Sequence, residues 1–226
     1  MILSYARVEI EAVFGRDLTL IEQAGRTCYK SEDLISENSA IQFAKMLLKR
    51  GHESVIEHSA MTVRFIIDRG VSHELVRHRL CAFSQESTRY CNYKGGVEFI
   101  IPPWAKKIEP GEYNGAGLSE RQEVMSTRAE RIWFYALQDD ERRYKELIKE
   151  GWRPEHARSV LPNSLKTEIV TTANFREWRH IFNLRVSPAA HPQMKLIMAE
   201  LLRQAHASIP VIFDDIYQKY IIYGKF

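Results

Sequence analysis

The 226-residue sequence lacks the features that mark several large classes of protein. No stretch approaches the roughly 18 to 20 uninterrupted apolar residues that a membrane-spanning helix needs, so we predict a soluble chain with no membrane partner. The first fifteen residues, MILSYARVEIEAVFG, carry charged side chains where a secretory signal would need an unbroken apolar core, which indicates a cytoplasmic location. Eleven Gly and eight Pro exclude low-complexity and collagen-like chains.

Cysteine and excess charge are also scarce. The three cysteines, Cys28, Cys81 and Cys91, have neither the paired short spacing of a zinc ribbon nor a CxxC motif, so no disulfide framework or structural metal is indicated. A net charge of +3 is too mild to indicate nucleic-acid binding. We therefore expect any anion site to be local.

The pattern of apolar residues predicts two unlike halves, separated by a Pro- and Gly-rich linker at residues 102–118. In the first half, alternation predicts strands around Val8, Ile10 and Ala12 and around Val63, Phe65 and Ile67. Helices are predicted from Asp17 or Thr19 to about Tyr29, and at residues 39–50. The second half is mostly helical. We predict the α+β fold class, with a mixed sheet and long helices in a single catalytic domain spanning residues 1–226.

One predicted helix of the second half is unusually long. Ser119 and Gln122 resemble a capping box, and a stripe that could run to Gly151 is formed by Met125, Ala129, Ile132, Ala136 and Leu137. Some 30 helical residues would span about 45 Å, longer than a compact monomer of this size comfortably covers. Self-association is therefore expected, unless the helix breaks near residues 139–140.

The rest of the second half gives shorter patterns. Pro154 suits a first helical position, and LKTEIVTT has the β-branched character of a strand. A further helix is marked by Trp178, Ile181 and Phe182. The clearest amphipathic helix runs from Met194 to Ala205 and ends before Pro210.

The densest group of polar residues lies at 71–90, where four basic side chains, Arg77, His78, Arg79 and Arg89, surround Ser84, Gln85 and Ser87. Guanidinium groups pair bidentately with phosphate, so the segment could hold phosphate-bearing ligands. Ser72 could cap a short helix with Val76 and Leu80 on its apolar face, placing Arg77 and Arg79 about 200° apart. A solvated basic surface explains the spacing equally well.

Two later arginines, Arg158 in ARSVLP and Arg185 in IFNLRVS, have apolar neighbours. A buried arginine needs a partner. That partner is either a structural carboxylate or a ligand's carboxylate, phosphate or imide oxygen, and the sequence leaves both open.

Metal and thiol chemistry have little support. His52, His58 and His73, taken with Cys81 or Cys91, match no metal-ligand spacing, so no metal site is predicted. None of the cysteines has a recognisable activating context. Most aromatic residues follow core periodicity, although some could stack a flavin or a base.

The string Arg77-His78-Arg79, followed seven residues later by Ser87 and then by Arg89-Tyr90, resembles the signature of the flavin-dependent thymidylate synthases. The resemblance continues in GHESVIEHSAMTVRF before the string and in ARSVLP, TTAN, FNLR and a following His after it, and covers roughly residues 1–215. The ordered set is far more specific than any single piece.

The resemblance implies a homotetrameric enzyme that uses FAD and NADPH to convert dUMP to dTMP, with the carbon taken from 5,10-methylenetetrahydrofolate. It implies FAD contacts for Ser54, Arg77, His78, Arg79, Asn174 and His180. It implies dUMP contacts for Glu74, Arg77, Gln85, Ser87, Arg89, Arg158 and Arg185, with ligands reaching more than one subunit. His52 matches a histidine near the flavin and folate pocket, and His191 fits a later one if two extra residues are allowed.

The resemblance also implies a catalytic role for Arg185 against the uracil ring. A guanidinium with a pKa above ~12 acts as a fixed positive charge that stabilises negative charge on the ring, and not as a base. Ser87 is expected to bind the nucleotide, because no adjacent base would activate its hydroxyl. Reduced flavin, in place of a catalytic cysteine, would supply the hydride.

Four positions depart from the commonest family pattern: Ala82, Ser84, Gln85 and His180 stand where Ser, Asn, Glu and Asn are usual. Gln85 can donate and accept hydrogen bonds but has no carboxylate charge. The flavin contact of His180, and its charge, are not fixed by the sequence.

Two other functions fit parts of the sequence. A nucleic-acid-binding module would use Arg69, Arg77, Arg79 and Arg89 with the rings of Tyr90 and Tyr93, and would show steep salt dependence. A flavoprotein of the same ancestry could keep NADPH oxidation and lose methyl transfer.

Overall fold

The computed structural model describes residues 1–113 and 126–224. It divides the chain into two compact units, each assembled from segments that are far apart in the sequence. Unit 1 contains Met1–Arg7, Ile66–Leu75 and Ser84–Ile169, and unit 2 contains Val8–Phe65, Val76–Phe83 and Val170–Phe226.

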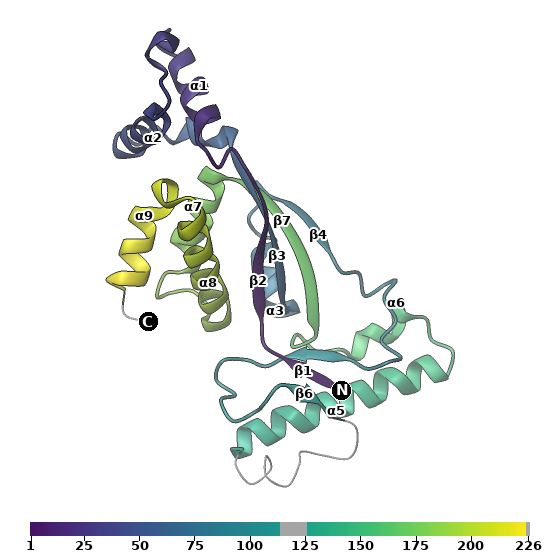
Figure 1. Ribbon diagram of the computed structural model, residues 1–226. Coiled ribbons are helices and arrows are strands. Elements are labelled where there is room, and N and C mark those ends of the chain that lie inside the picture. The colour runs from purple at the N-terminus through teal and green to yellow at the C-terminus, as the bar shows by residue number, and fades with distance from the viewer. Residues whose placement is uncertain (114–125, 225–226) are drawn as a thin grey trace. The chain divides into compact units, whose positions relative to one another are not determined.

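Unit 1 has a three-stranded sheet of order β5-β1-β6 and a long helix (Figure 1). Strand β1 pairs in parallel with β5 and antiparallel with β6. The strands are β1 (Ile2–Ser4), β5 (Glu98–Ile100) and β6 (Gly111–Glu112). The helices are α3 (Arg69–Leu75), α5 (Arg128–Lys149), α6 (Pro154–Ala157) and the 3₁₀ turn η3 (Arg158–Val160), and the last two pack against α5.

Unit 2 is largely helical. Its helices are α1 (Thr19–Thr27), α2 (Ser39–Lys49), α7 (Phe175–Arg185), α8 (Pro192–Ser208) and α9 (Pro210–Tyr217). Shorter turns are η1 (Glu32–Leu34), η2 (Glu53–His58) and the π-helical turn η4 (Gln218–Ile222). Helices α7, α8 and α9 lie side by side (Figure 1).

A four-stranded sheet has the order β2-β3-β7-β4. Its strands are β2 (Arg7–Phe14), β3 (Ala60–Asp68), β4 (Ala82–Gln85) and β7 (Lys166–Asn174), and each has residues in both units. In β3, Val63, Phe65 and Ile67 are buried, as the alternation predicted. The mixed α+β class is thereby confirmed, whereas the single catalytic domain stays a prediction.

The core of unit 1 corrects the predicted face of the long helix. Phe134, Leu137 and Tyr144 of α5 are buried in a cluster with residues of β1 and β5, whereas Ala129, Ile132 and Ala136 are exposed. The buried face also carries Glu130 and Glu141. Leu137 belonged to the predicted stripe and is buried, so the stripe lay partly on the wrong face.

The start of α5 also differs from the prediction. Thr127 caps the helix, and Glu130 completes a capping box with it. Ser119, Gln122 and Met125, which were expected at this end, lie outside the described residues. From Arg128 the helix runs unbroken through Asp139 and Asp140, over a length of about 33 Å.

The helix that Ser72 was expected to cap is also different. Helix α3 starts at Arg69, and Asp68 accepts a hydrogen bond from the backbone N–H of Val71 at 2.7 Å. The helix ends at Leu75, so Val76 and Leu80 are exposed on turns and form no helical face. Because Asp68 already caps the helix, Ser72 is an interior residue.

The core of unit 2 is built on aromatic residues. Trp178, Phe182 and Phe213 are fully buried, and the Trp178 indole N–H donates to the Met61 carbonyl at 2.9 Å. The predicted amphipathic pattern from Met194 to Ala205 is confirmed by the buried face of α8. None of the helices in the described ranges is long and apolar enough to cross a membrane.

Candidate functional site

In unit 2, one hydrogen bond joins the basic segment at 76–83 to the end of helix α7. Arg185, the last residue of α7, donates from Nε to the Nε2 atom of His78 at 2.9 Å. His78 is buried and Arg185 is half-buried. Because α7 packs on the core through Trp178 and Ile181, the helix fixes where Arg185 lies.

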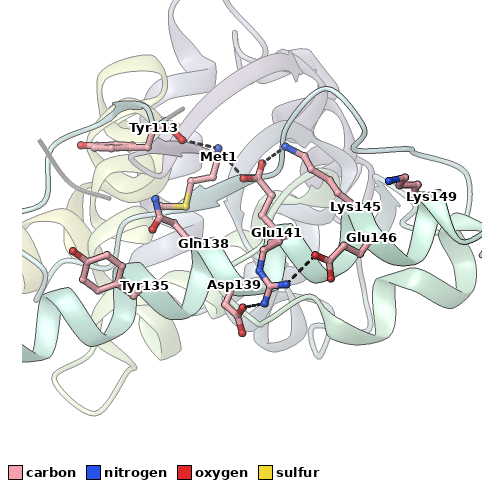
Figure 2. A pocket seen from close by; sticks show the side chains of 10 residues that line it. Met1, Tyr113, Tyr135, Gln138, Asp139, Glu141, Lys145, Glu146 and Lys149 are labelled. Atoms are coloured by element: carbon pink, nitrogen blue, oxygen red, sulfur yellow. Dashed lines mark hydrogen bonds and ion pairs between the residues drawn. The ribbon is translucent and has the colours of Figure 1, made fainter. Parts of the chain in front are cut away.

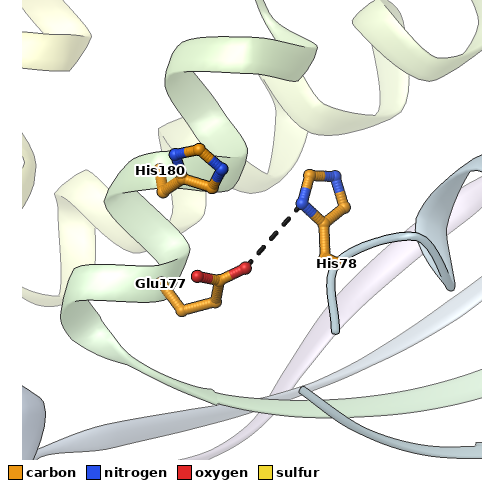
Figure 3. A group of neighbouring side chains, drawn as sticks. All are labelled: His78, Glu177 and His180. Carbon is orange, nitrogen blue, oxygen red and sulfur yellow. Dashed lines mark ion pairs between the residues drawn. The ribbon is translucent and has the colours of Figure 1, made fainter. Parts of the chain in front are cut away.

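The His78 ring is neutral in this arrangement. Burial, the nearby Arg185 guanidinium and His180 together lower the pKa of His78 from 6.5 to about 4. Since Nε2 accepts from Arg185, the ring proton is assigned to Nδ1. That nitrogen lies 3.8 Å from Oε1 of Glu177, as Figure 3 shows.

Glu177 is a buried carboxylate that is not among the site residues predicted from the sequence. Its backbone N–H donates to Oδ1 of Asn174, the N-cap of α7, at 2.8 Å. Burial raises the pKa of the Glu177 carboxyl, and His180 opposes this. In the sequence, Asn followed by Glu three positions later has the spacing of an ordinary helix start, which gives no sign of a buried carboxylate.

His78, Glu177 and His180 each offer a ligand atom, and these atoms lie within 4.8 Å of one another (Figure 3). Two imidazoles and a carboxylate form a donor set that zinc accepts. In the observed conformation, however, the Nε2 lone pair of His78 is used by Arg185, and Nδ1 carries the proton. A metal ion at Nδ1 would therefore require Arg185 to leave His78.

A cavity of about 690 Å³ adjoins this group, and its lining includes Leu80, Asn174, Glu177, His180 and Asn183. This volume is within the range of small-molecule sites. Two predicted FAD residues, Asn174 and His180, therefore border one space. Asn174 already uses Oδ1 as the helix cap, which leaves its amide N–H groups for a ligand.

Arg77 and Arg79 differ from most other arginines of unit 2. Both are exposed, and within the part of the chain that the structure describes their side chains form no ion pair or hydrogen bond. Arg179, by contrast, is bound to Asp215 at 2.7 and 2.8 Å and to Glu53 at 3.1 Å. The cationic groups of Arg77 and Arg79 can therefore meet an anionic ligand. Ser54, on η2, is exposed as well.

In unit 1, a second group contains the predicted nucleotide-binding residues. The Arg158 guanidinium donates to Oγ1 of buried Thr88 at 2.9 Å, and Nε of Arg89 lies 3.7 Å from Glu155. Ser87 Oγ accepts from the backbone N–H of Arg89 at 3.3 Å. Among the described residues Arg158 has no carboxylate partner, so the structural ion pair considered for it is not present there.

Gln85 has a fixed orientation in unit 1. Its Nε2 donates to the hydroxyls of Ser72 at 2.9 Å and Thr167 at 3.1 Å. The hydroxyl proton of Ser72 is itself donated to the Arg69 carbonyl, so Ser72 must accept from the amide. The Gln85 carbonyl is then the group left to accept from a ligand. Glu74, on α3, is half-buried.

Cys81, His52, His191 and Tyr93 were considered for thiol chemistry, ligand contacts or nucleic-acid binding. Burial and nearby Glu177 raise the pKa of Cys81 to about 12, which disfavours a thiolate nucleophile. His52 and His191 are exposed at the starts of η2 and α8. The hydroxyl of Tyr93 donates to Glu86 at 2.7 Å, so this ring is poorly placed for a nucleic acid base.

The cavity on α5 has different electrostatics. Its volume is about 630 Å³, and several of its cations are matched by carboxylates: Glu141 binds the Met1 amine at 2.9 Å and Lys145 at 3.0 Å (Figure 2). Arg142 pairs with Glu146 at 2.9 Å. These pairs leave the cavity a weaker candidate for an anionic ligand than the segment of Arg77 and Arg79.

The chain is similar to known proteins over most of its length. The family model described as "Thymidylate synthase complementing protein" matches residues 11–211. The flavin-dependent thymidylate synthase of Geobacter sulfurreducens is 32% identical over 200 residues, which cover 85% of this chain and 78% of the relative. The flavin-dependent thymidylate synthase of Corynebacterium aurimucosum is 30% identical over 214 residues, which cover 92% of this chain and 83% of the relative.

A solved structure has the same fold. The UMP/dUMP methylase PolB from Streptomyces cacaoi, bound with 5-Br dUMP, superimposes with a TM-score of 0.75 over 97% of this chain and 98% of that one. The two sequences are 23% identical.

Proposed function

Because this chain belongs to the flavin-dependent thymidylate synthase family, we propose that it converts dUMP to dTMP by reductive methylation. In this proposal 5,10-methylenetetrahydrofolate supplies the carbon, FAD is the bound cofactor and NADPH is the reductant. The observation that carries the proposal is that the family match at 11–211 contains every residue expected to contact FAD or dUMP.

The residues of unit 2 fit a flavin dinucleotide. Its diphosphate needs donors and positive charge, which the exposed Arg77 and Arg79 offer without a competing carboxylate among the described residues. Ser54, His78, Asn174 and His180 would complete the contacts, and the adjoining cavity of about 690 Å³ provides space for a ring. When bound, the flavin supplies hydride transfer to the pyrimidine.

The residues of unit 1 fit a nucleoside monophosphate. Arg89 and Arg158 supply two guanidinium groups and Ser87 a hydroxyl, a combination suited to a phosphate dianion. Thr88 holds one nitrogen of Arg158 and so limits its orientations. The carbonyl of Gln85 would accept from a hydroxyl or N–H of the nucleotide. Glu74 is a further expected dUMP contact.

Arg185 would provide the electrostatic part of catalysis. Placed against the uracil ring, its fixed charge stabilises negative charge that develops on N3 and the neighbouring carbonyl. The hydrogen bond from Nε to His78 restrains the guanidinium before substrate binds. A donor that is already held in position needs little reorganisation during the reaction.

We also propose assembly as a homotetramer, with ligands contacted by more than one subunit. The exposed side of α5 supports self-association, since Ile132 and Tyr135 are 62% and 38% exposed beside Ala129 and Ala136. Sedimentation velocity tests this directly. A monomer at micromolar concentration would contradict it.

The cofactor is tested by colour and reduction. The purified protein, or the protein incubated with FAD, should be yellow, and anaerobic NADPH with dUMP should bleach the visible absorbance. Protein that remains colourless after incubation with FAD would refute the proposal. Competition between dUMP and oligonucleotides at several salt concentrations distinguishes the enzyme from a nucleic-acid-binding module. The affinity of such a module for oligonucleotides should fall steeply as salt rises.

A further inference from the structure

Glu177 has an unusual environment for a carboxylate. It is 7% exposed, and no hydrogen bond to its carboxylate is formed within the described ranges. Its carboxylate lies 3.8 Å from the Nδ1 atom of His78, which is longer than a hydrogen bond but short enough for attraction to an N–H dipole. Burying a carboxylate with so little compensation is unfavourable, so its presence calls for an explanation other than stability.

We propose that Glu177 is a positioning residue for the nucleotide-binding Arg185, acting through His78. The carboxylate favours the ring tautomer with the proton on Nδ1, and that tautomer presents the Nε2 lone pair to the Nε–H of Arg185 at 2.9 Å. The role assigned to Arg185 rests on the proposed function. The chain of contacts from Glu177 to Arg185 rests on the geometry alone.

The direction of the effect follows from counting protons on His78. If the proton moved to Nε2, two N–H groups would face each other across the 2.9 Å contact, and Arg185 would be pushed away. A nearby carboxylate fixes the tautomer of histidines that bind metals, and the guanidinium stands here in the place of the metal. Removing such a supporting group typically costs roughly 10- to 100-fold in affinity or activity.

A positioning role can be separated from a structural one with Glu177→Leu. Replacing a buried, weakly compensated carboxylate by an apolar side chain should leave the unfolding free energy unchanged or raise it. FAD affinity is measured alongside, because His78 is a proposed FAD contact and Glu177 lines the adjoining cavity. The dissociation constant for dUMP should nevertheless rise by roughly 10- to 100-fold. A purely structural residue would not weaken dUMP binding while stability is kept.

Glu177→Gln is the conservative variant. Its amide oxygen can still accept from the Nδ1–H group, so its affinity for dUMP should stay within about threefold of the wild type. Glu200→Gln is the matched control, because Glu200 is an exposed carboxylate on α8 whose partners are Arg203 and Gln204. The control should bind dUMP as the wild type does.

The experiment is isothermal titration of dUMP into the FAD-loaded proteins, together with ¹⁵N spectra that identify the tautomer of each histidine ring. The wild type should show the Nδ1–H form of His78 at neutral pH, and Glu177→Leu should lose that preference. Adding Glu177→Leu to Arg185→Ala should cause no further loss of affinity for dUMP, because Glu177 acts only through Arg185 in this proposal.

Two results would overturn the inference: an Nε2–H tautomer of His78 in the wild type, or Glu177→Leu protein that binds dUMP within about twofold of the wild type. If the wild type itself failed to bind FAD and dUMP, the proposed function would be refuted. The tautomer would still test the link between Glu177 and His78, so the two failures are distinguishable.

Discussion

The exposed arginines of segment 76–83 in unit 2 differ from Arg142, an exposed arginine on α5 in unit 1. In unit 2, buried Arg179 is held by Asp215 and Glu53, and exposed Arg77 and Arg79 have no partner among the described residues. In unit 1, exposed Arg142 pairs with Asp139 and Glu146 on the surface of α5. Burial alone therefore does not reveal which arginines are available to a ligand, whereas the identity of the partner does.

Arg158 and Arg185 lie between these extremes. Each has a hydrogen bond to a neutral group, Thr88 in one case and His78 in the other. For Arg158, which has no carboxylate partner among the described residues, this bond restrains the guanidinium without cancelling its charge. This is the arrangement expected of a residue that must meet an anion in a defined orientation.

The largest effect is expected from Arg185→Ala. Loss of the charge against the uracil ring should lower kcat/KM for dUMP by about 100- to 1000-fold, as the loss of one preorganised donor does elsewhere. The urea midpoint of unfolding should change little, because the side chain is half-buried at the last residue of α7. Steady-state assays of dTMP formation and urea titrations measure the two quantities. Undiminished turnover would remove Arg185 from the mechanism.

Arg179 and Arg142 test the comparison through stability. Arg179→Met removes a buried guanidinium that reaches Asp215, Glu53 and the Ile212 carbonyl, and should lower the unfolding free energy by about 2 to 3 kcal/mol. Arg142→Met breaks only exposed ion pairs and should have no measurable effect. Equal losses for the two variants in urea unfolding would mean that burial does not govern their contributions.

Arg79→Ala and Arg158→Ala test whether these two arginines contact different ligands. The first should weaken FAD binding and the second dUMP binding, each by roughly 10- to 100-fold, since one charge-assisted contact is lost in each case. Fluorescence titration with FAD and calorimetry with dUMP give the two affinities. If each variant weakened the binding of both ligands equally, the assignment of Arg79 to FAD and Arg158 to dUMP would fail.

The smallest effect concerns pH and His78. The pKa of His78 falls from 6.5 to about 4 on folding, so the unfolded chain binds more protons between these values. Its contribution to stability is complete above pH 6.5 and is lost as the pH falls toward 4, amounting to about 2 kcal/mol by pH 5. Unfolding free energies at pH 7 and 5 should therefore differ less in His78→Gln than in the wild type. An identical pH dependence would show that His78 is not held neutral by the fold.

Much of the fold was predictable from local patterns. The helices at residues 17–29 and 39–50, the strand containing Val63 and the amphipathic helix after Met194 follow from periodicity and are confirmed. The buried face of α5 was not predictable in the same way, because Glu130 and Glu141 pack inward on backbone N–H groups of Lys107 and Val97. Such compensation depends on tertiary contacts.

The candidate site was also predictable only in part, because its tertiary contacts do not show in local sequence patterns. The ordered arginines and serine of residues 77–89 could be selected from the sequence as an anion-binding group. Their supporting residues could not, because Thr88 meets Arg158 across 70 positions and His78 meets Arg185 across 107. Glu177 was hidden for another reason: its spacing from Asn174 is that of an ordinary helix start.

Transfer of labelled carbon is the most direct test of the central claim. Protein supplied with FAD, NADPH, dUMP and 5,10-methylenetetrahydrofolate labelled in the methylene carbon should form labelled dTMP, and omission of FAD from cofactor-free protein should abolish it. Oxidation of NADPH with no label in dTMP would contradict the account and would favour a flavoprotein that has lost methyl transfer.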